Sequence, residues 1–260
     1  MNNNNSFELH NHYSGSTSES LTFGYTLKQG GYSPYPNQNF NMALYIGDDI
    51  KNVHAHQEML AEEINFPPES WVLPIQKHGG NIKEVTAADG GTNIKTLSDQ
   101  LYDVDGLYTY DTGVLLTMNY ADCIPVYVYS AVDNFTGLAH AGWRGTAEHI
   151  TEKLINCYEG SKDDLRVIIG IGINKEYYEV DNTVIDALTP VPESSYEQTD
   201  TGWQLDLKDV NKHQAIQAGI KLQHISVTSI GTEADEFFSF RLEQGNTGRA
   251  LAFIGRHNND

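Results

Sequence analysis

The segment VLLTMNYADCIPVYVYSAVDNFTGLAHAGWRG, from Val114 to Gly145, decides the fold class. It holds three apolar runs, at Val114–Met118, Ile124–Tyr129 and Gly137–Ala139, and the turn-forming letters VDNFTG separate the last two. Continuous apolar runs are typical of strands that are buried on both faces of a sheet. The segment therefore predicts three such strands.

Amphipathic stretches before and after this segment predict helices. Ile50–Ile64 carries apolar residues at helical spacing, and Asp48 or Asp49 is its expected N-cap. A second helix is expected over 147–160, where Thr146 opens the stretch and the glycine at its end supplies the C-cap.

The last hundred residues add further strands and a third helix. LRVIIGIGI predicts a buried strand, DLKDVNKHQAIQAGI a helix that ends at Gly219, and HISVTSI and RALAFIGRH two final strands. No linker or internal repeat is present, and strands and helices mix without strict alternation. The pattern predicts a single α+β or α/β domain with mixed sheets over residues 21–260.

The composition limits the partners and the compartment. The net charge of -19, from 16 Lys and Arg against 35 Asp and Glu, repels phosphate backbones and anionic lipid surfaces and argues against nucleic-acid and membrane partners. Two cysteines are too few for a disulfide framework, which favours a reduced, cytoplasmic setting. Residues 1–20 lack the charged and apolar regions of a signal peptide and predict a polar, frayed segment.

Three side chains share a local pattern that indicates a metal site. His78, Cys123 and His140 each follow an apolar run, and Gly or Pro comes within two residues. Strand ends that converge at one sheet edge bring such side chains together. Two imidazoles and one thiolate suit Zn²⁺, and three protein ligands leave a fourth position open, as in catalytic zinc sites.

Simpler interpretations stay open on these grounds. A lone buried cysteine is usually a small apolar core residue, and a histidine after a strand is more often hydrogen-bonded than metal-bound. Cys157 lies in the apolar stripe of its predicted helix and is interpreted as packing. Asp122, beside Cys123, is a candidate general base or an outer partner of the metal site, or an ordinary turn residue.

The HAGWRGT turn is a second candidate site. Gly142 and Gly145 allow a ligand to approach the backbone, and Arg144 adds positive charge there, which suits phosphate. Arg241 and Arg249 stand beside other Gly-rich turns and are further candidates for phosphate binding, or solvated loop residues.

Several motifs in this order resemble one bacterial family. The stretches are MNYADCIPV, GLAHAGWRGT, DVDGLYT, IGIGINKEYYEV and FFSFRLEQGNTGR, and FGYTLKQGGYSPYPNQNFNMALYIGDD fits the family's N-terminal pattern. The family is that of the multicopper polyphenol oxidases (laccase-like), also described as laccase-domain purine nucleoside phosphorylases. The resemblance implies an α+β domain with mixed sheets layered between helices. It also implies one Zn²⁺ per chain on His78, Cys123 and His140, with Cu²⁺ possible at the same site.

The resemblance further implies chemistry on purine nucleosides. Expected reactions are phosphorolysis of adenosine, inosine, guanosine and methylthioadenosine, and deamination of adenosine, with nucleosides and phosphate as partners. Asp122 or Glu84 is the candidate proton shuttle, and Arg144 or Arg241 the candidate phosphate ligand. The chain departs from the family pattern at QKHGG, at His56 and Gln57, and in VTSIGTEADEFF, which lacks a common cysteine; these changes bear on substrate preference. The sequence leaves monomer and homodimer both open.

Two other enzyme classes compete with this interpretation. A metal-free hydrolase or deamidase would use Cys123 as nucleophile and His140 as base. A copper-dependent polyphenol oxidase would need a three-copper cluster besides its electron-transfer copper, and thus roughly ten histidines as ligands. The chain has ten in all, and His54 and His56 point to different sides of their predicted helix. The sequence thus favours a single metal.

Overall fold

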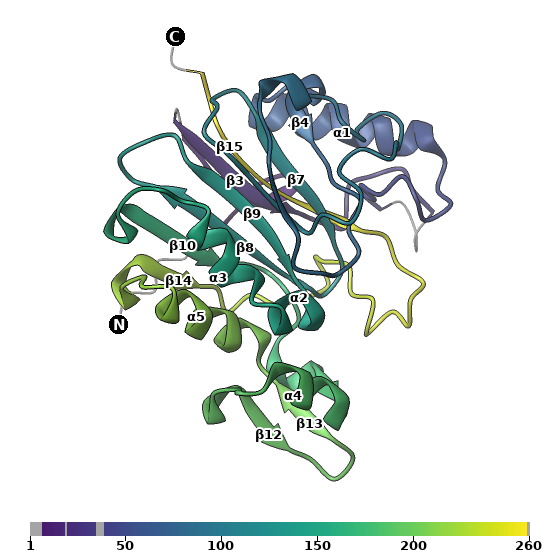
Figure 1. Ribbon diagram of the computed structural model, residues 1–260. Coiled ribbons are helices and arrows are strands. Elements are labelled where there is room, and N and C mark those ends of the chain that lie inside the picture. Colours follow the sequence, from purple (N-terminus) through teal and green to yellow (C-terminus); the bar gives the residue numbers. More distant parts are fainter. Residues whose placement is uncertain (1–6, 19, 35–38, 259–260) are drawn as a thin grey trace.

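Within the described residues of this computed structural model, 7–18, 20–34 and 39–258, two six-stranded mixed sheets pack face to face (Figure 1). The first has the spatial order β1 (Glu8–Leu9), β2 (Tyr13–Thr17), β3 (Leu21–Thr26), β15 (Ala250–Arg256), β7 (Leu115–Tyr120) and β4 (Trp71–Val72). The second has the order β14 (Ile225–Val227), β10 (Leu165–Ile169), β8 (Ile124–Ser130), β9 (Thr136–Ala141), β6 (Gly106–Thr109) and β5 (Ile82–Glu84).

Helices cover the outer faces of both sheets. The α-helices are α1 (Ile50–Ile64), α2 (Trp143–Ala147), α3 (Ile150–Asn156), α4 (Asn182–Leu188) and α5 (Leu207–Gln217). Single 3-10 turns occur at Pro68–Ser70, Ala87–Asp89, Lys162–Asp164, Lys175–Tyr177, Glu193–Ser195 and Leu222–His224. A small sheet of β11 (Glu179–Val180), β13 (Trp203–Leu205) and β12 (Tyr196–Gln198) forms a lobe with α4 at the bottom of Figure 1.

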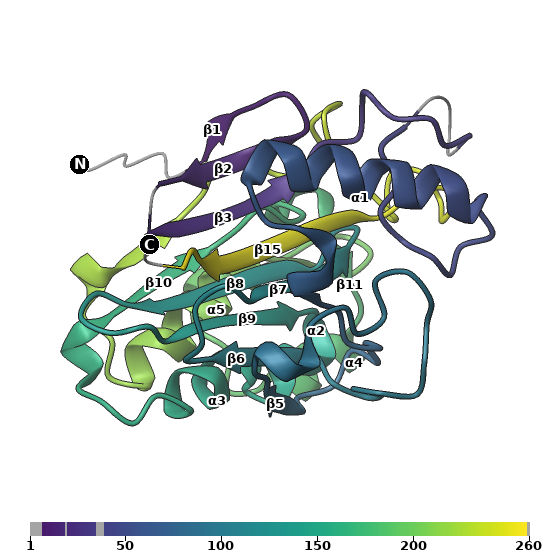
Figure 2. The same ribbon diagram turned by 90° about the horizontal axis from the view of Figure 1, so that it is seen from above.

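Three apolar clusters define the layers. Leu116 and Met118 of β7 meet Tyr127 of β8 and Leu138 of β9 between the two sheets. Leu60 and the rest of the apolar face of α1 pack on the outside of the first sheet, and α3 and α5 pack on the outside of the second (Figure 2). The predicted α+β fold, a single domain with mixed sheets between helices, is confirmed.

The strands predicted from the opening segment are present. Every residue of β7 and of β9 is buried, as expected for strands covered on both faces. The helix Ile50–Ile64 is also confirmed, and Asp49 is its cap, because the Asp49 side chain accepts a hydrogen bond from the backbone N–H of Lys51. The third predicted helix corresponds to α5, which is followed by Gly219 with a φ of 95°.

The frayed segment predicted over 1–20 differs from the structure. Residues 1–6 and 19 lie outside the described residues, but β2 pairs with β3 along its whole length, and Tyr13 is buried. Only glycine fits at position 15, since a Cβ there would lie 2.2 Å from the carbonyl oxygen of Phe23. The small and polar residues of YSGST form no apolar run, so the sequence did not predict this strand. The strand is stabilised by its pairing with β3 and by the buried side chain of Tyr13.

The helix predicted over 147–160 is also wrong in its bounds. The chain enters helix earlier, at Trp143, and Thr146 lies buried inside α2 instead of opening a helix. His149 then adopts a left-handed φ of 59°, which separates α2 from α3. The second helix ends at Asn156 with Cys157 as its C-cap, four residues before the glycine expected there.

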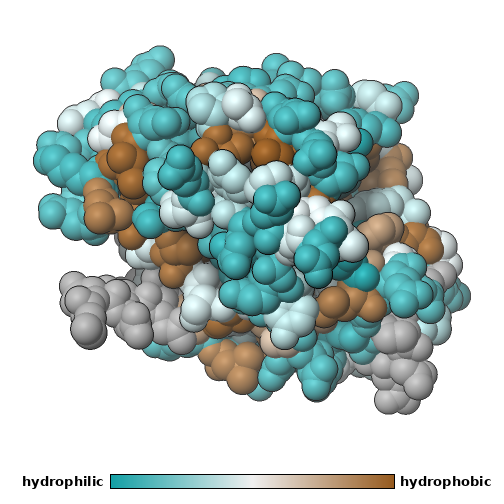
Figure 3. Space-filling view, turned by 90° about the horizontal axis from the view of Figure 1, so that it is seen from below, coloured by the Kyte–Doolittle hydropathy of each residue, from teal (hydrophilic) through white to brown (hydrophobic). Residues whose placement is uncertain are grey.

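The surface agrees with the polar composition. On the face seen from below, hydrophobic residues form separate brown groups between hydrophilic ones (Figure 3). None of the described helices is long and apolar enough to cross a membrane.

Candidate metal centre

The three predicted ligands lie together. One ligand atom each from His78, Cys123 and His140 falls within 4.8 Å of the others, and the two imidazole rings have centroids 4.8 Å apart at 77°. His140 is buried, Cys123 partly buried and His78 exposed, so the group is open to solvent on the His78 side. Two nitrogens and one sulfur fit Zn²⁺ or a similar soft divalent ion with one free coordination position.

Strand register explains why Cys123 and His140 meet. Cys123 immediately precedes β8, and His140 in antiparallel β9 pairs with Pro125. Gly142, the residue between β9 and α2, lets the chain pass close to Cys123. A Cβ at this position would lie 2.9 Å from Cys123 Sγ, which is too close. Figure 1 shows β9 leading directly into α2. His78 arrives from the loop between β4 and β5 with a left-handed φ of 64°.

Asp105 organises the centre and was not predicted as a site residue. Its carboxylate is fully buried, accepts a hydrogen bond from His140 Nδ1 at 3.1 Å, and accepts the backbone N–H groups of Lys77, His78 and Gly79 at 2.9–3.0 Å. One side chain therefore fixes the ring of one ligand and the loop of another. With Nδ1 bonded to Asp105, Nε2 is the His140 nitrogen that remains available to hold a metal. The signal available in sequence was an aspartate inside the apolar stretch DVDGLYT.

Electrostatics prepare the ligands for metal binding. Burial alone would raise the pKa of Cys123, but the charge of His140 and hydrogen bonds from His140 and His78 lower it to about 6. Burial alone would lower the pKa of His140, but the charge of Cys123 and the hydrogen bond to Asp105 raise it to about 9. Without metal, a thiolate and an imidazolium therefore coexist between pH of about 6 and about 9, and metal binding must displace the His140 proton.

Asp105 itself stays ionised in this environment. Burial would raise the pKa of its carboxyl, but the hydrogen bond and charge of His140 and the N–H groups of Lys77 and Gly79 lower it. Four hydrogen bonds thereby compensate the buried negative charge.

Asp122 braces the long segment between β14 and β15 against the site. Its Oδ1 accepts hydrogen bonds from the hydroxyls of Thr232 and Ser239, and its Oδ2 accepts the backbone N–H of Arg241, all at 2.7 Å. The residue has a positive φ of 88°, which is uncommon for a residue with a side chain, just before the start of β8. The carboxylate is thus occupied by the segment that carries Arg241, next to the ligand Cys123.

Two of the predicted arginines lie near the ligands. The guanidinium of Arg241 stacks 5.1 Å from the Tyr178 ring and donates from Nη1 to the carbonyl of Glu179. Burial and the charge of Cys123 raise the pKa of Tyr178, while Arg241 and Arg144 lower it. Tyr178 therefore experiences the charges of Cys123, Arg241 and Arg144, and the Arg144 guanidinium itself lies 4.2 Å from the centroid of the Trp143 ring.

A second aromatic side chain was also missed by the sequence. Desolvation of its hydroxyl raises the pKa of Tyr45, and the charge of Arg249 and a hydrogen bond with it oppose this shift, although the residue as a whole is 54% exposed. Tyr178, whose ring centroid lies 5.1 Å from the Arg241 guanidinium, extends the site beyond the three candidate ligands. Aromatic residues in loops carry no spacing signal that could have identified them.

Glu84 is not brought into the site. It ends the edge strand β5, where its carboxylate accepts a hydrogen bond from Tyr108, whose partner on β9 is Gly137. Gly137 precedes His140 by three residues, or about 10 Å along the strand. Cys157 also lies elsewhere and donates its thiol to the carbonyl of Lys153 in α3.

Comparison with known proteins identifies the family. A family model described as multi-copper polyphenol oxidoreductase laccase matches residues 22–257. The chain belongs to this laccase-like family. It is 45% identical over 242 residues to a purine nucleoside phosphorylase of Staphylococcus saprophyticus, across 91% of this chain and 92% of the relative. The crystal structure of YlmD from Geobacillus stearothermophilus is 37% identical and superposes with a TM-score of 0.92, over 97% of this chain and 99% of that one.

A second solved structure agrees. The Bacillus licheniformis hypothetical protein YfiH shares 34% identity and a TM-score of 0.87, across 90% of this chain and 92% of that one. The laccase-like fold is thus shared along nearly the whole chain.

The histidines of this laccase-like chain do not form further metal clusters in the part that the structure describes, where His78, Cys123 and His140 are the one such group. His56 is buried, with Nδ1 on the carbonyl of Asn41 and Nε2 accepting the backbone N–H of Tyr32. His54 Nε2 contacts the carbonyl of Lys95. The two histidines of α1 therefore have other partners.

Proposed function

We propose that the chain is a zinc-dependent purine nucleoside phosphorylase acting on adenosine, inosine, guanosine and methylthioadenosine, with adenosine deamination as a second activity. The observation that carries the proposal is the open His78–Cys123–His140 group with arginines beside it. Relatives at more than 40% identity bear the name purine nucleoside phosphorylase. The charge of the chain and its two cysteines support a cytoplasmic enzyme of small molecules.

Each residue of the site has a separate role in the proposed reactions. Arg241 and Arg144 hold phosphate near the anomeric carbon, where a phosphate oxygen forms the new bond while the bond to purine N9 breaks. Asp105 keeps His140 and the His78 loop in place, and Asp122 positions Arg241 instead of moving a proton. When bound, zinc would lower the pKa of a water ligand to about 7, which supplies hydroxide for deamination.

Dependence on phosphate tests this proposal. With phosphate, adenosine is expected to give adenine and ribose 1-phosphate; without phosphate, only inosine is expected. Mass spectrometry of the products of a nucleoside panel, with and without phosphate, measures both reactions. A product mixture that does not respond to phosphate would contradict phosphorolysis.

The family's description favours a second candidate, a copper-dependent polyphenol oxidase. We expect one metal ion per chain, zinc in protein isolated from cells, and at most weak phenol oxidation after copper loading, because the described histidines supply one three-ligand group. Elemental analysis and visible absorption check this. Four coppers per chain with strong visible absorption and fast phenol oxidation would restore the oxidase interpretation.

The metal-free hydrolase alternative has one observation in its favour. When no metal is bound, Cys123 and His140 form a thiolate–imidazolium ion pair, in which the imidazole has already taken the proton of the nucleophilic thiol. Metal content separates the two possibilities: activity that rises with added zinc and falls with a chelator supports the metalloenzyme, and activity that survives complete metal removal supports the hydrolase.

A further inference from the structure

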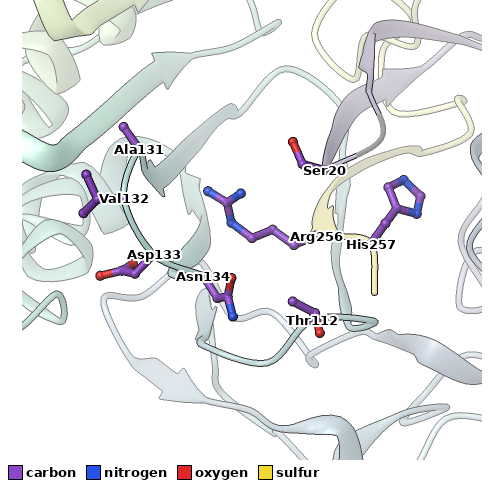
Figure 4. Close-up of a pocket in the computed structure, with 8 residues that line it drawn as sticks. All are labelled: Ser20, Thr112, Ala131, Val132, Asp133, Asn134, Arg256 and His257. Carbon is purple, nitrogen blue, oxygen red and sulfur yellow. The ribbon is translucent and has the colours of Figure 1, made fainter. Parts of the chain in front are cut away.

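A polar pocket of about 210 Å³ opens at the end of the sheets remote from the metal centre (Figure 4). It lies where β8 and β15 end, whereas Cys123 precedes the start of β8. The six residue steps from Ile124 to Ser130 span about 20 Å. Its lining residues are Ser20, Thr112, Ala131, Val132, Asp133, Asn134, Arg256 and His257.

Arg256 is the cation of this pocket. Its Nη2 donates to the carbonyl of Ser130 at 2.5 Å, and its buried Nε has no hydrogen-bond partner. None of the ion pairs among the described residues includes this guanidinium. Burial lowers the pKa of Arg256, and the nearby charges of Asp133 and Tyr129 offset part of this shift without forming a contact ion pair.

The other polar groups leave room for an anion beside Arg256. Asp133, the one carboxylate of the lining, is turned away from the guanidinium in Figure 4; its oxygens accept hydrogen bonds from the backbone N–H of Phe135 and the hydroxyl of Tyr158. Within the described residues, neither the Ser20 hydroxyl nor the Asn134 amide has a hydrogen-bond partner. Asp133 keeps the total charge of the pocket low, so a ligand with a single negative charge fits best.

We propose that this pocket binds a small oxyanion, a carboxylate or a phosphate group, through the outer edge of the Arg256 guanidinium. The two terminal nitrogens of arginine match two oxygens of such a group. Ser20 and Asn134 supply further donors from the walls. The site is separate from the proposed nucleoside site and does not depend on that proposal.

The experiment is a calorimetric titration of the full chain with acetate and with inorganic phosphate, at constant ionic strength set with sodium chloride. All titrations use protein that carries both Cys123→Ala and Arg241→Gln, so that anions cannot bind at the metal centre or at the proposed phosphate ligand Arg241. This double variant is the reference. We expect binding to weaken at least tenfold on Arg256→Gln. The matched control is Arg166→Gln, since Arg166 is also partly buried and donates to backbone carbonyls but lies outside the pocket; it should bind as the reference does.

Asn134→Asp provides a second variant in case Arg256→Gln fails to fold. It adds a carboxylate at an exposed turn position with little change in shape, and should also weaken binding about tenfold. Binding of acetate identifies a carboxylate ligand, and binding of phosphate alone identifies a phosphate ligand. The proposal is overturned if neither anion binds, or if binding is unchanged by the pocket variants.

Discussion

Cys123→Ala is expected to remove the metal and nearly all activity while the fold survives. The thiolate is one of three ligands, and its loss leaves two imidazoles, so the fall in activity should exceed the 10–100-fold typical of losing an outer partner of a metal site. The fold persists because β7 and β8, on either side of Cys123, are held by buried apolar side chains in the core between the sheets. Metal content, kcat/KM and the melting temperature are the measurements.

Cys157→Ala is the matched control for this prediction. Cys157 caps α3 and does not face the metal ligands, so its variant should keep both metal and activity. Cys123→Ala should melt close to the temperature of chelator-treated wild-type protein, since both lack the stabilisation that bound metal gives. Equal behaviour of the two cysteine variants would show that the ligand assignment is wrong.

Asp105→Ala has the second largest expected effect. It leaves the N–H groups of Lys77, His78 and Gly79 without their acceptor and frees the ring of His140. Each of these part-buried hydrogen bonds to a charged group contributes about 1.5–3 kcal/mol, and metal affinity should fall about 10–100-fold. Competition with a coloured chelator measures the affinity, and chemical unfolding measures the stability.

Asp105→Asn separates the two effects. The amide retains an acceptor oxygen for the loop, so stability should recover in part, but it lacks the charge that holds the His140 proton, so metal affinity should stay low. Asp103→Asn is the control, because Asp103 is exposed and contacts Asn81 at the surface. Wild-type metal affinity in both Asp105 variants would refute the role given to this residue.

Local patterns were sufficient for much of the fold. The apolar runs around Cys123 identified β7, β8 and β9, because a strand covered on both faces has no polar alternation to obscure it. The bounds of α1 followed from its apolar stripe and from the capping aspartate. The prediction failed at β2 and at the α2–α3 break, where pairing with β3 and one left-handed residue decide the structure.

By itself, the sequence determined which three side chains are the candidate ligands and that they stand at or near strand ends, since His78, Cys123 and His140 each carry their own local signal. Only the tertiary structure decided what surrounds them. Asp105 reaches two ligands because β6 lies beside β9 and the His78 loop folds over both. The brace from Asp122 to Arg241 joins residues more than a hundred positions apart. Such contacts depend on side-chain directions after packing, and no spacing along the chain encodes them.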